Sequence, residues 1–201
     1  MRLDWRHGVY GDSHKGAGLG SIFVLERLGS EQWFDDYFAT CDSMFDRNNG
    51  LMGLDKPPTG DDDQIGGTFH YSFLYEHFHR PMPYPERRID TVIGLQQHDG
   101  YWDTGNPLWL SFDAVYLMTR TLRYCHYRLD DVRQAVRRVM SALMRDAFGP
   151  EGRTRTFSGR LGSHLVTAAI SLSAEAQSFL GSREVITSWP LRFVLDRRPF
   201  I

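Results

Sequence analysis

Apolar side chains recur with the period of an α-helix in three stretches of this chain. Ser30 precedes the first stretch at the position of a helix N-cap, and Pro85 opens the second, where its missing N–H costs nothing. Asp130 begins the third and suits the positive end of a helix dipole. One face of each stretch is apolar and the other polar, which predicts amphipathic helices. These helices cover residues 31–45, 85–97 and 130–148.

Four further stretches are apolar around more of their circumference. They cover about residues 18–28, 67–78, 108–123 and 161–180. A helix that is hydrophobic on nearly all sides is typically buried, so these stretches predict helices that the amphipathic ones cover. Amphipathic and buried helices therefore alternate along the chain, and the predicted fold class is all-α.

The joints that follow the amphipathic helices are similar to one another. Each is a polar turn with a glycine, at Gly50, Gly100 and Gly149, and the intervals between these glycines are 50 and 49 positions. Glycine after a helix commonly adopts the left-handed conformation that ends the helix. A near-constant interval between similar joints indicates a repeat of about fifty residues, each a helical hairpin.

This order of amphipathic outer helix, glycine turn and buried inner helix resembles the α/α toroid. That is the fold of α/α-barrel glycosidases and lyases and of terpenoid cyclases and protein prenyltransferases. The segment Gln97-His98-Asp99-Gly100-Tyr101-Trp102 is similar to the Q-x-x-G-x-W element of the terpenoid cyclase and prenyltransferase repeat, whereas the turn at Gly50 lacks both the Gln and the Trp. The resemblance implies inner helices around a central cavity, with polar residues of the turns and inner-helix N-termini at its rim.

The chain departs from a closed toroid. It opens at a glycine turn and passes directly into a buried helix, so one inner helix is followed by three outer–inner pairs. We expect an incomplete toroid, an open arc of about three and a half hairpins, in a single domain over residues 1–201 with residues 182–201 as a tail packing on the helices. The exposed flank of such an arc should be apolar, and a second copy or missing N-terminal hairpins should cover it.

The net charge and the amino-acid composition indicate which kinds of binding partner to expect. The formal net charge is −2, from 23 Lys and Arg against 25 Asp and Glu, so the chain lacks the basic field that drives nucleic-acid binding. It has neither a run of eighteen apolar residues nor an apolar N-terminal signal, so we expect no membrane span and a cytoplasmic location. Cys41 and Cys125 alone indicate no disulfide framework. A small molecule or an oligosaccharide is the expected ligand.

A run of three carboxylates and one isolated carboxylate are candidates for a general acid. Asp61–Asp63 precede a buried helix, where they either cap the helix or crowd together so that one of them keeps its proton. Asp113 interrupts an apolar stretch, and a carboxylate there either faces a wet cavity or pairs with an arginine. The acidic motifs of terpenoid cyclases, D-x-D-D and D-D-x-x-D, are not present in the Asp61–Asp63 segment.

Histidines on the buried helices are candidate partners in proton transfer. His70 lies within an apolar and aromatic stretch, where a hydrogen-bonded core residue is the alternative interpretation. His14 and His164 lie near the starts of the first and last buried helices, as bases or as polar lining. No H-E-x-x-H spacing occurs, and no Asp-Cys-His set surrounds either cysteine, so we expect no catalytic metal and no cofactor.

The polar rim favours a carbohydrate-active enzyme, similar to glycoside hydrolases or lyases, or a carbohydrate-binding cleft. Asp113 or Asp63 would act as the general acid, with His70 or Asp99 as its partner. The expected substrate-binding residues, which include two Trp rings for stacking on sugars, are Asp12, His14, Trp102, Asn106, Trp109, Arg155 and His164. The alternatives are an enzyme like the terpenoid cyclases or prenyltransferases, and a non-catalytic scaffold or truncated relative of a larger toroid enzyme.

Overall fold

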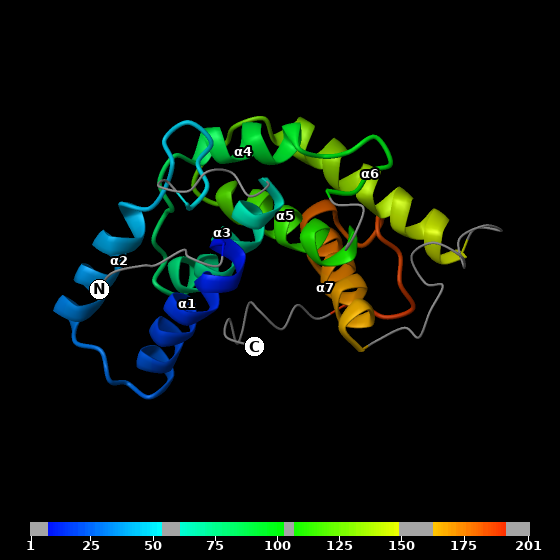
Figure 1. Ribbon diagram of the computed structural model, residues 1–201. Helices are drawn as coiled ribbons and strands as arrows, with labels where there is room; N and C mark the ends of the chain where they lie inside the picture. Colours follow the sequence, from blue (N-terminus) through cyan, green and yellow to red (C-terminus); the bar gives the residue numbers. More distant parts are fainter. Residues whose placement is uncertain (1–7, 54–60, 103–106, 149–162, 192–201) are drawn as a thin grey trace. The chain divides into compact units, whose positions relative to one another are not determined.

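The computed structural model describes residues 8–53, 61–102, 107–148 and 163–191 (Figure 1). In those residues every regular element is a helix, apart from one isolated bridge between Phe45 and Met52. The predicted all-α class is therefore confirmed. The helices are α1 (Val9–Leu25), α2 (Glu31–Asp42), α3 (Asp61–His77), α4 (Pro85–Gly94), α5 (Pro107–Thr121), α6 (Leu129–Phe148) and α7 (Ser163–Leu180).

The helices follow the predicted order, and most of their ends lie within a few residues of the expected positions. The Ser30 side chain accepts a hydrogen bond from Trp33 N at 3.1 Å, which confirms the predicted N-cap of α2. α1 and α3 begin earlier than expected, at Val9 and Asp61, because their first turns are polar or glycine-rich and only their later turns are apolar. The toroid arrangement and the fifty-residue repeat stay predictions.

The described chain divides into two compact units, and the boundary between them lies within α4. In the first unit α1 packs along α3, and two glycines allow the helices to approach closely. A Cβ on Gly20 would lie 2.6 Å from Leu74 Cδ1, and a Cβ on Gly67 would collide with Val9. Because only glycine fits at these contacts, the close approach brings the first turns of α1 against the middle of α3.

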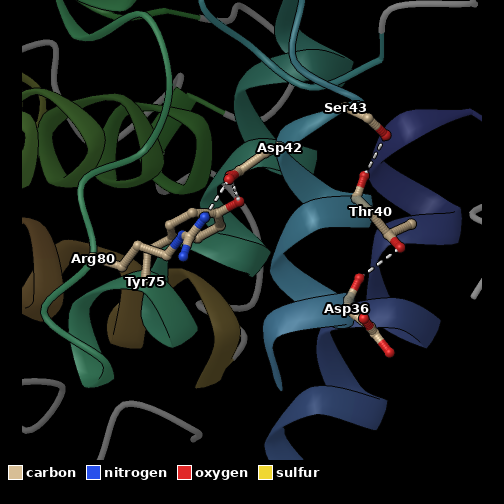
Figure 2. Close-up of polar contacts among 6 residues, drawn as sticks. All are labelled: Asp36, Thr40, Asp42, Ser43, Tyr75 and Arg80. Atoms are coloured by element: carbon tan, nitrogen blue, oxygen red, sulfur yellow. Dashed lines mark hydrogen bonds and ion pairs between the residues drawn. The ribbon is translucent and has the colours of Figure 1, made fainter. Parts of the chain in front are cut away.

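α2 packs on α3 through aromatic rings and one shared carboxylate. Phe38 contacts Tyr75 edge to face, with ring centroids 4.9 Å apart. Figure 2 shows Asp42, at the end of α2, accepting hydrogen bonds from Tyr75 Oη at 2.6 Å and from Arg80 Nη2 at 2.5 Å. Each oxygen of this carboxylate therefore has a donor, and the charge of Arg80 balances that of Asp42.

A glycine turn leads from α2 toward α3. Gly50 has a φ of 71°, and its carbonyl oxygen accepts a hydrogen bond from Arg88 Nε at 3.1 Å. A Cβ at this position would lie 2.5 Å from Arg88 N and 2.7 Å from Tyr84 O, which are backbone atoms at the start of α4. The turn therefore lies directly against α4. Gly100 also has a positive φ, of 102°, whereas Gly149 lies outside the described residues.

In the second unit α5 packs along α7, and α6 contacts both. A buried ion pair joins α5 to α7, because Arg120 Nη2 lies 2.6 Å from Glu175 Oε2. Thr119 Oγ1 donates to the other oxygen of Glu175. The Arg120 guanidinium also lies over the Tyr116 ring, 4.6 Å from its centroid. Removing either charge would leave the other buried without its counter-ion, at a cost of about 3–5 kcal/mol.

Side-chain amides connect α6 and the segment after α7 to this unit. Gln96 Nε2 donates to Ala135 O on α6 at 2.9 Å. Gln177 Nε2 donates to Val185 O at 2.8 Å, and Leu191 N donates to Gln177 Oε1 at 2.7 Å. The described part of the expected tail is thus bonded to α7, and the rest of that tail lies outside the described residues.

The second half of α1 is not the buried helix that its composition predicts. Leu19, Ile22 and Leu25 are all exposed, and so is Leu28 beyond the end of the helix. The expectation of a buried helix over residues 18–28 is therefore wrong for this side of α1. Hydrophobicity reports a preference for burial but does not show whether a covering partner belongs to the same chain.

We expect Gly50→Ala to destabilise the protein by at least about 2 kcal/mol, because a Cβ adds strain at positive φ and collides with the backbone of α4. The matched control is Gly94→Ala, whose Cβ would meet no atom within 4 Å and should leave stability unchanged or slightly higher. Urea denaturation of the two variants and the wild type measures the difference. Equal stability of the two variants would contradict the contact between the turn and α4.

Candidate functional site

Asp63 places the first turn of α1 against α3. Its two carboxylate oxygens accept hydrogen bonds from Val9 N and Tyr10 N, each at 2.7 Å. A carboxylate at the free N–H groups of a helix start satisfies those donors and complements the helix dipole. The contacts of Asp63 are therefore those of a cap, although the capped helix is α1 and not the helix that carries the residue. To act as a catalytic acid, Asp63 would have to release these two bonds.

Four side chains from α1 and α3 come together beside this cap, and we call them the imidazole cluster: Tyr10, Ser13, His14 and His70. His70 Nδ1 lies 2.7 Å from Ser13 Oγ. The ring centroids of His14 and His70 are 4.0 Å apart at an interplanar angle of 39°, and the Tyr10 ring lies 5.2 Å from His14 and 5.0 Å from His70. Tyr10 and His14 are exposed and His70 is half-buried, so solvent reaches the cluster.

The Ser13 hydroxyl has one proton, and two acceptors lie within its reach. Ser13 Oγ is 2.6 Å from Tyr10 O and 2.7 Å from His70 Nδ1. If the hydroxyl donates to the carbonyl, which can only accept, His70 Nδ1 carries a proton and donates to Ser13 Oγ. This assignment satisfies all three groups. It leaves the lone pair of neutral His70 on Nε2, where the ring can act as a base.

Burial keeps His70 neutral. Burial, together with the neighbouring His14, lowers the pKa of His70 from 6.5 to about 4. The ring therefore accepts a proton at one nitrogen and donates from the other at neutral pH. This is the protonation state that a general base needs before it reacts.

Two predicted site residues of the first unit, Asp12 and Asp63, are already bonded to other groups. Asp12 is buried in the first turn of α1 and forms an ion pair with Lys15 at 2.8 Å. Asp63 caps α1 with both of its oxygens. Among the described residues, the imidazole cluster adds two imidazoles and a phenol that can exchange protons at this place.

The second unit contains a contact between turn and helix like the one that precedes His70. The N–H two residues after each turn glycine donates to a hydroxyl on the following helix, Thr68 Oγ1 at 2.9 Å in the first unit and Ser111 Oγ at 3.4 Å in the second. His70 stands two residues beyond Thr68, and Asp113 stands two residues beyond Ser111. The two residues therefore occupy corresponding positions on α3 and α5.

Asp113 is buried on α5, and one of its oxygens has no partner within the described part of the chain. The residue is 4% exposed, and Oδ1 is the oxygen that lacks a hydrogen-bond donor there. Pairing with an arginine, one of its two expected environments, is not found among the described residues, where Arg120 bonds to Glu175 instead. Burial raises the pKa of Asp113 well above its ordinary value, which favours the neutral carboxylic acid. An acid of this kind costs stability and is typical of functional sites.

The two Trp rings expected to stack on sugars belong to the second unit. Trp102 is buried, and its Nε1 donates to Val92 O at 2.6 Å, so this ring is part of the core and offers no face to a sugar. Trp109 is half-buried on α5, with its ring edge to face against Phe112 and the centroids 6.1 Å apart. Of the two, only Trp109 keeps part of its surface accessible.

The remaining predicted site residues include one in a turn and several that the structure does not describe. Asp99 Oδ1 accepts a hydrogen bond from Tyr101 N at 3.0 Å, within the turn at Gly100. This is a bond that shapes the turn, and Asp99 lies in a different unit from His70. Asn106 and Arg155 lie outside the described residues, as do the side chains of Asp61, Asp62 and His164.

The sequence-based site omitted Tyr10 and Ser13. The expected buried helix began at about residue 18, which left both residues in a turn. The signal for an earlier start is Asp12, because an acidic residue is favoured in the first turn of a helix. A helix that begins at Val9 places Tyr10, Ser13 and His14 on adjacent positions of one turn, where they can meet a neighbouring helix together.

Within the described residues, no three or more His, Cys, Asp or Glu side chains lie together as a metal site would need. None of the described helices combines the length and the apolarity needed to cross a membrane. No protein-family model, no curated protein and no solved structure matches the chain. The chemistry of the imidazole cluster and of Asp113 is therefore the basis for inferring a function.

We expect Asp113→Asn to stabilise the protein at neutral pH. The unfolded chain ionises this carboxyl above about pH 4, whereas the folded protein keeps it protonated because burial raises its pKa. The folded state then binds more protons, so wild-type stability falls as pH rises, by up to about 1.4 kcal/mol per pH unit until the folded group ionises. Asp113→Asn has no carboxyl group at this position, so its stability should not fall with pH in this way.

Urea denaturation at about pH 4 and pH 7 measures the gap between Asp113→Asn and the wild type, which should widen toward pH 7. The control is Asp130→Asn, because Asp130 is an exposed acid in the first turn of α6. A gap of equal size at the two pH values would mean that Asp113 is ionised in the folded protein.

Proposed function

We propose that the chain is a carbohydrate-active enzyme of the lyase type and that the imidazole cluster supplies its acid–base groups. The observation that carries the proposal is the contact between Ser13 and His70 beside the His14 ring. It provides a neutral base with a fixed ring orientation, next to a second imidazole and the Tyr10 phenol. All of these groups transfer protons, and solvent reaches the place where they meet.

Proton abstraction fits this cluster better than glycosidic hydrolysis does. Hydrolysis commonly uses two carboxyl groups, one as acid and the other as base or nucleophile. The carboxylates of Asp12 and Asp63 are already committed, one to Lys15 and the other to the cap of α1. Among the described residues, the cluster itself consists of imidazoles, a phenol and a hydroxyl, which favours a reaction that needs only a base and a proton donor.

Elimination from a uronic acid residue is such a reaction. A base removes the proton from the carbon next to the uronate carboxylate, and the pair of electrons released forms a C=C bond. The C–O bond to the leaving sugar breaks, and the leaving oxygen takes up a proton. In the proposed site His70 is the base, and His14 or Tyr10 donates the second proton.

A uronate also suits the charge beside the imidazole cluster. Lys15 follows His14 directly on α1, and its exposed ammonium would attract the carboxylate of such a sugar. One ammonium that is already paired with Asp12 is a weak site for a diphosphate, which prefers a cluster of cations. The site of the first unit therefore favours a uronic oligosaccharide over an isoprenyl diphosphate.

A second candidate function is that of an enzyme like the terpenoid cyclases, and Asp113 is the observation that favours it. Burial raises the pKa of this acid and so favours its neutral form, and its neighbours along α5, among them Phe112 and Tyr116, are buried and aromatic. A neutral carboxylic acid in such surroundings can protonate an uncharged double bond. The resemblance of residues 97–102 to the Q-x-x-G-x-W element indicates the same class. Trp102 does not contribute to substrate binding in either case, because its ring is in the core.

Thermal melts of the full chain separate these candidates. A ligand at one hundred times its Kd adds about 2.7 kcal/mol to stability, which a cooperative melt reports as a higher Tm. We expect a shift with uronic oligosaccharides and none with neutral oligosaccharides or isoprenyl diphosphates. A shift with isoprenyl diphosphates alone would support the cyclase-like function instead. No shift with any of these ligands would favour a non-catalytic scaffold.

His70→Gln should lower kcat for the uronic oligosaccharide that binds by about 10²–10⁴-fold, while the ligand still shifts the melt. The measurement is the ultraviolet absorbance of the unsaturated sugar that elimination produces. The control is His77→Gln, since His77 lies on the same helix and is exposed. Full activity of His70→Gln, or equal losses in the two variants, would rule out His70 as the base.

A further inference from the structure

The exposed side of α1 carries a line of four residues with apolar side chains in the middle and opposite charges at the ends. Lys15, Leu19, Ile22 and Glu26 follow one another at helical spacing, which places them along one face. Leu19 is 39% and Ile22 54% exposed, and the side chain of Lys15 is 74% exposed. Leu25, which is also exposed, lies beside this line. We call the four residues the α1 stripe.

Two glycines on the same side of α1 leave space beside the stripe. A Cβ on Gly11 or on Gly18 would meet no atom within 4 Å. Gly11 lies one turn before Lys15, and Gly18 is next to Leu19. Because the distance between two packed helices depends on the side chains at their contact, glycines here allow another helix to approach closely.

We propose that α1 pairs with α1 of a second copy of this chain, antiparallel about a two-fold axis near Gly20 and Ser21. In this arrangement Leu19 of each copy packs on Ile22 of the other, and Lys15 of each faces Glu26 of the other. A two-fold interface uses the same surface on both copies, so each of these contacts occurs twice. This proposal does not depend on the function proposed above.

Charge complementarity selects the second copy and its orientation. An antiparallel pair gives two contacts between Lys15 and Glu26, whereas a parallel pair in register would oppose like charges at both ends of the α1 stripe. Lys15 Nζ donates to Asp12 Oδ1 at 2.8 Å. An ammonium has three protons to donate, so the same Lys15 can also bond to Glu26 of the other copy.

The exposed apolar residues of α7 do not have this self-complementarity. Val166 and Ile170 are exposed on one side of α7, but the helix contains no Lys or Arg. Its only carboxylate, Glu175, is buried and bonded to Arg120. α7 therefore offers a matched control surface, equally apolar but without charges that would orient a second copy.

Sedimentation velocity of the full chain over a range of concentrations tests the proposal. One pair of helices is a small interface, so we expect a monomer–dimer equilibrium with a Kd in roughly the micromolar range. Ile22→Asp should be monomeric at every concentration, because it places a carboxylate against Leu19 of the other copy at both central contacts. The control Ile170→Asp, on α7, should dimerise like the wild type. A cooperative melt of each variant establishes that it is folded.

An exchange of charges between two variants tests the register. Lys15→Glu and Glu26→Lys should each dimerise at least about tenfold more weakly alone, because each variant opposes like charges. When the two are mixed, every contact between residues 15 and 26 joins opposite charges, so the mixture should form a heterodimer with restored affinity.

Three results would overturn the proposal. A wild-type chain that stays monomeric at the highest concentration has no such interface. A dimer that Ile170→Asp disrupts and Ile22→Asp does not would use α7 instead of α1. A mixture of the two charge variants that stays monomeric would show that residues 15 and 26 do not face each other.

Discussion

The N–H groups that follow the two glycine turns bond to hydroxyls on the next helix, and these bonds set the rotation of α3 and α5. A buried N–H without an acceptor would cost about 1–3 kcal/mol, so Thr68 and Ser111 must face their turns. A helix turns by about 100° per residue, so the residue two positions later points to the opposite side. His70 and Asp113 are directed away from the turns in this way, by contacts in which neither takes part. The direction of the His70 and Asp113 side chains therefore follows from the hydrogen bonds that the turn N–H groups need.

Four carboxyl groups of this protein differ in the hydrogen-bond donors and cations that stabilise them. Asp42 accepts bonds from a phenol and a guanidinium, Asp63 from two backbone N–H groups, and Glu175 from Arg120 and a hydroxyl. Asp113 is more buried than Asp42 and Asp63 and nearly as buried as Glu175, yet its Oδ1 has no donor among the described residues. An amide or an apolar residue there would avoid the cost of burying an acid whose unfolded form is ionised at neutral pH. The reason for an acid at this position therefore lies outside stability, which makes it a functional hypothesis.

Periodicity predicted α2, α4 and α6 because each of these helices has an apolar and a polar face, and Ser30 indicated where α2 begins. The same approach placed the start of α1 too late and predicted that its second half is buried. The sequence of a helix does not show which other element, if any, covers it. Asp113 was identified as a candidate because an acid within an apolar run is costly wherever it lies. The sequence could not show that the Trp102 ring lies in the core. That position depends on the hydrogen bond from its Nε1 to the backbone carbonyl of Val92. The contact between Ser13 and His70 joins residues 57 positions apart, beyond the range of any local pattern.

The composition of α1 connects the imidazole cluster to the α1 stripe. Four of the residues between Val9 and Leu25 are glycines, and each makes a helix about 1 kcal/mol less stable than alanine would. α1 therefore depends on the Asp63 cap and on its packing along α3, and the cluster that spans the two helices is only as ordered as that packing. If α1 pairs with a second copy, the pairing covers Leu19 and Ile22 on the exposed side and adds contacts that only the ordered helix can make. By mass action, dimerisation would then favour the state in which His14 stacks on His70, so the two proposals would be thermodynamically linked although Lys15 is the one residue that they share.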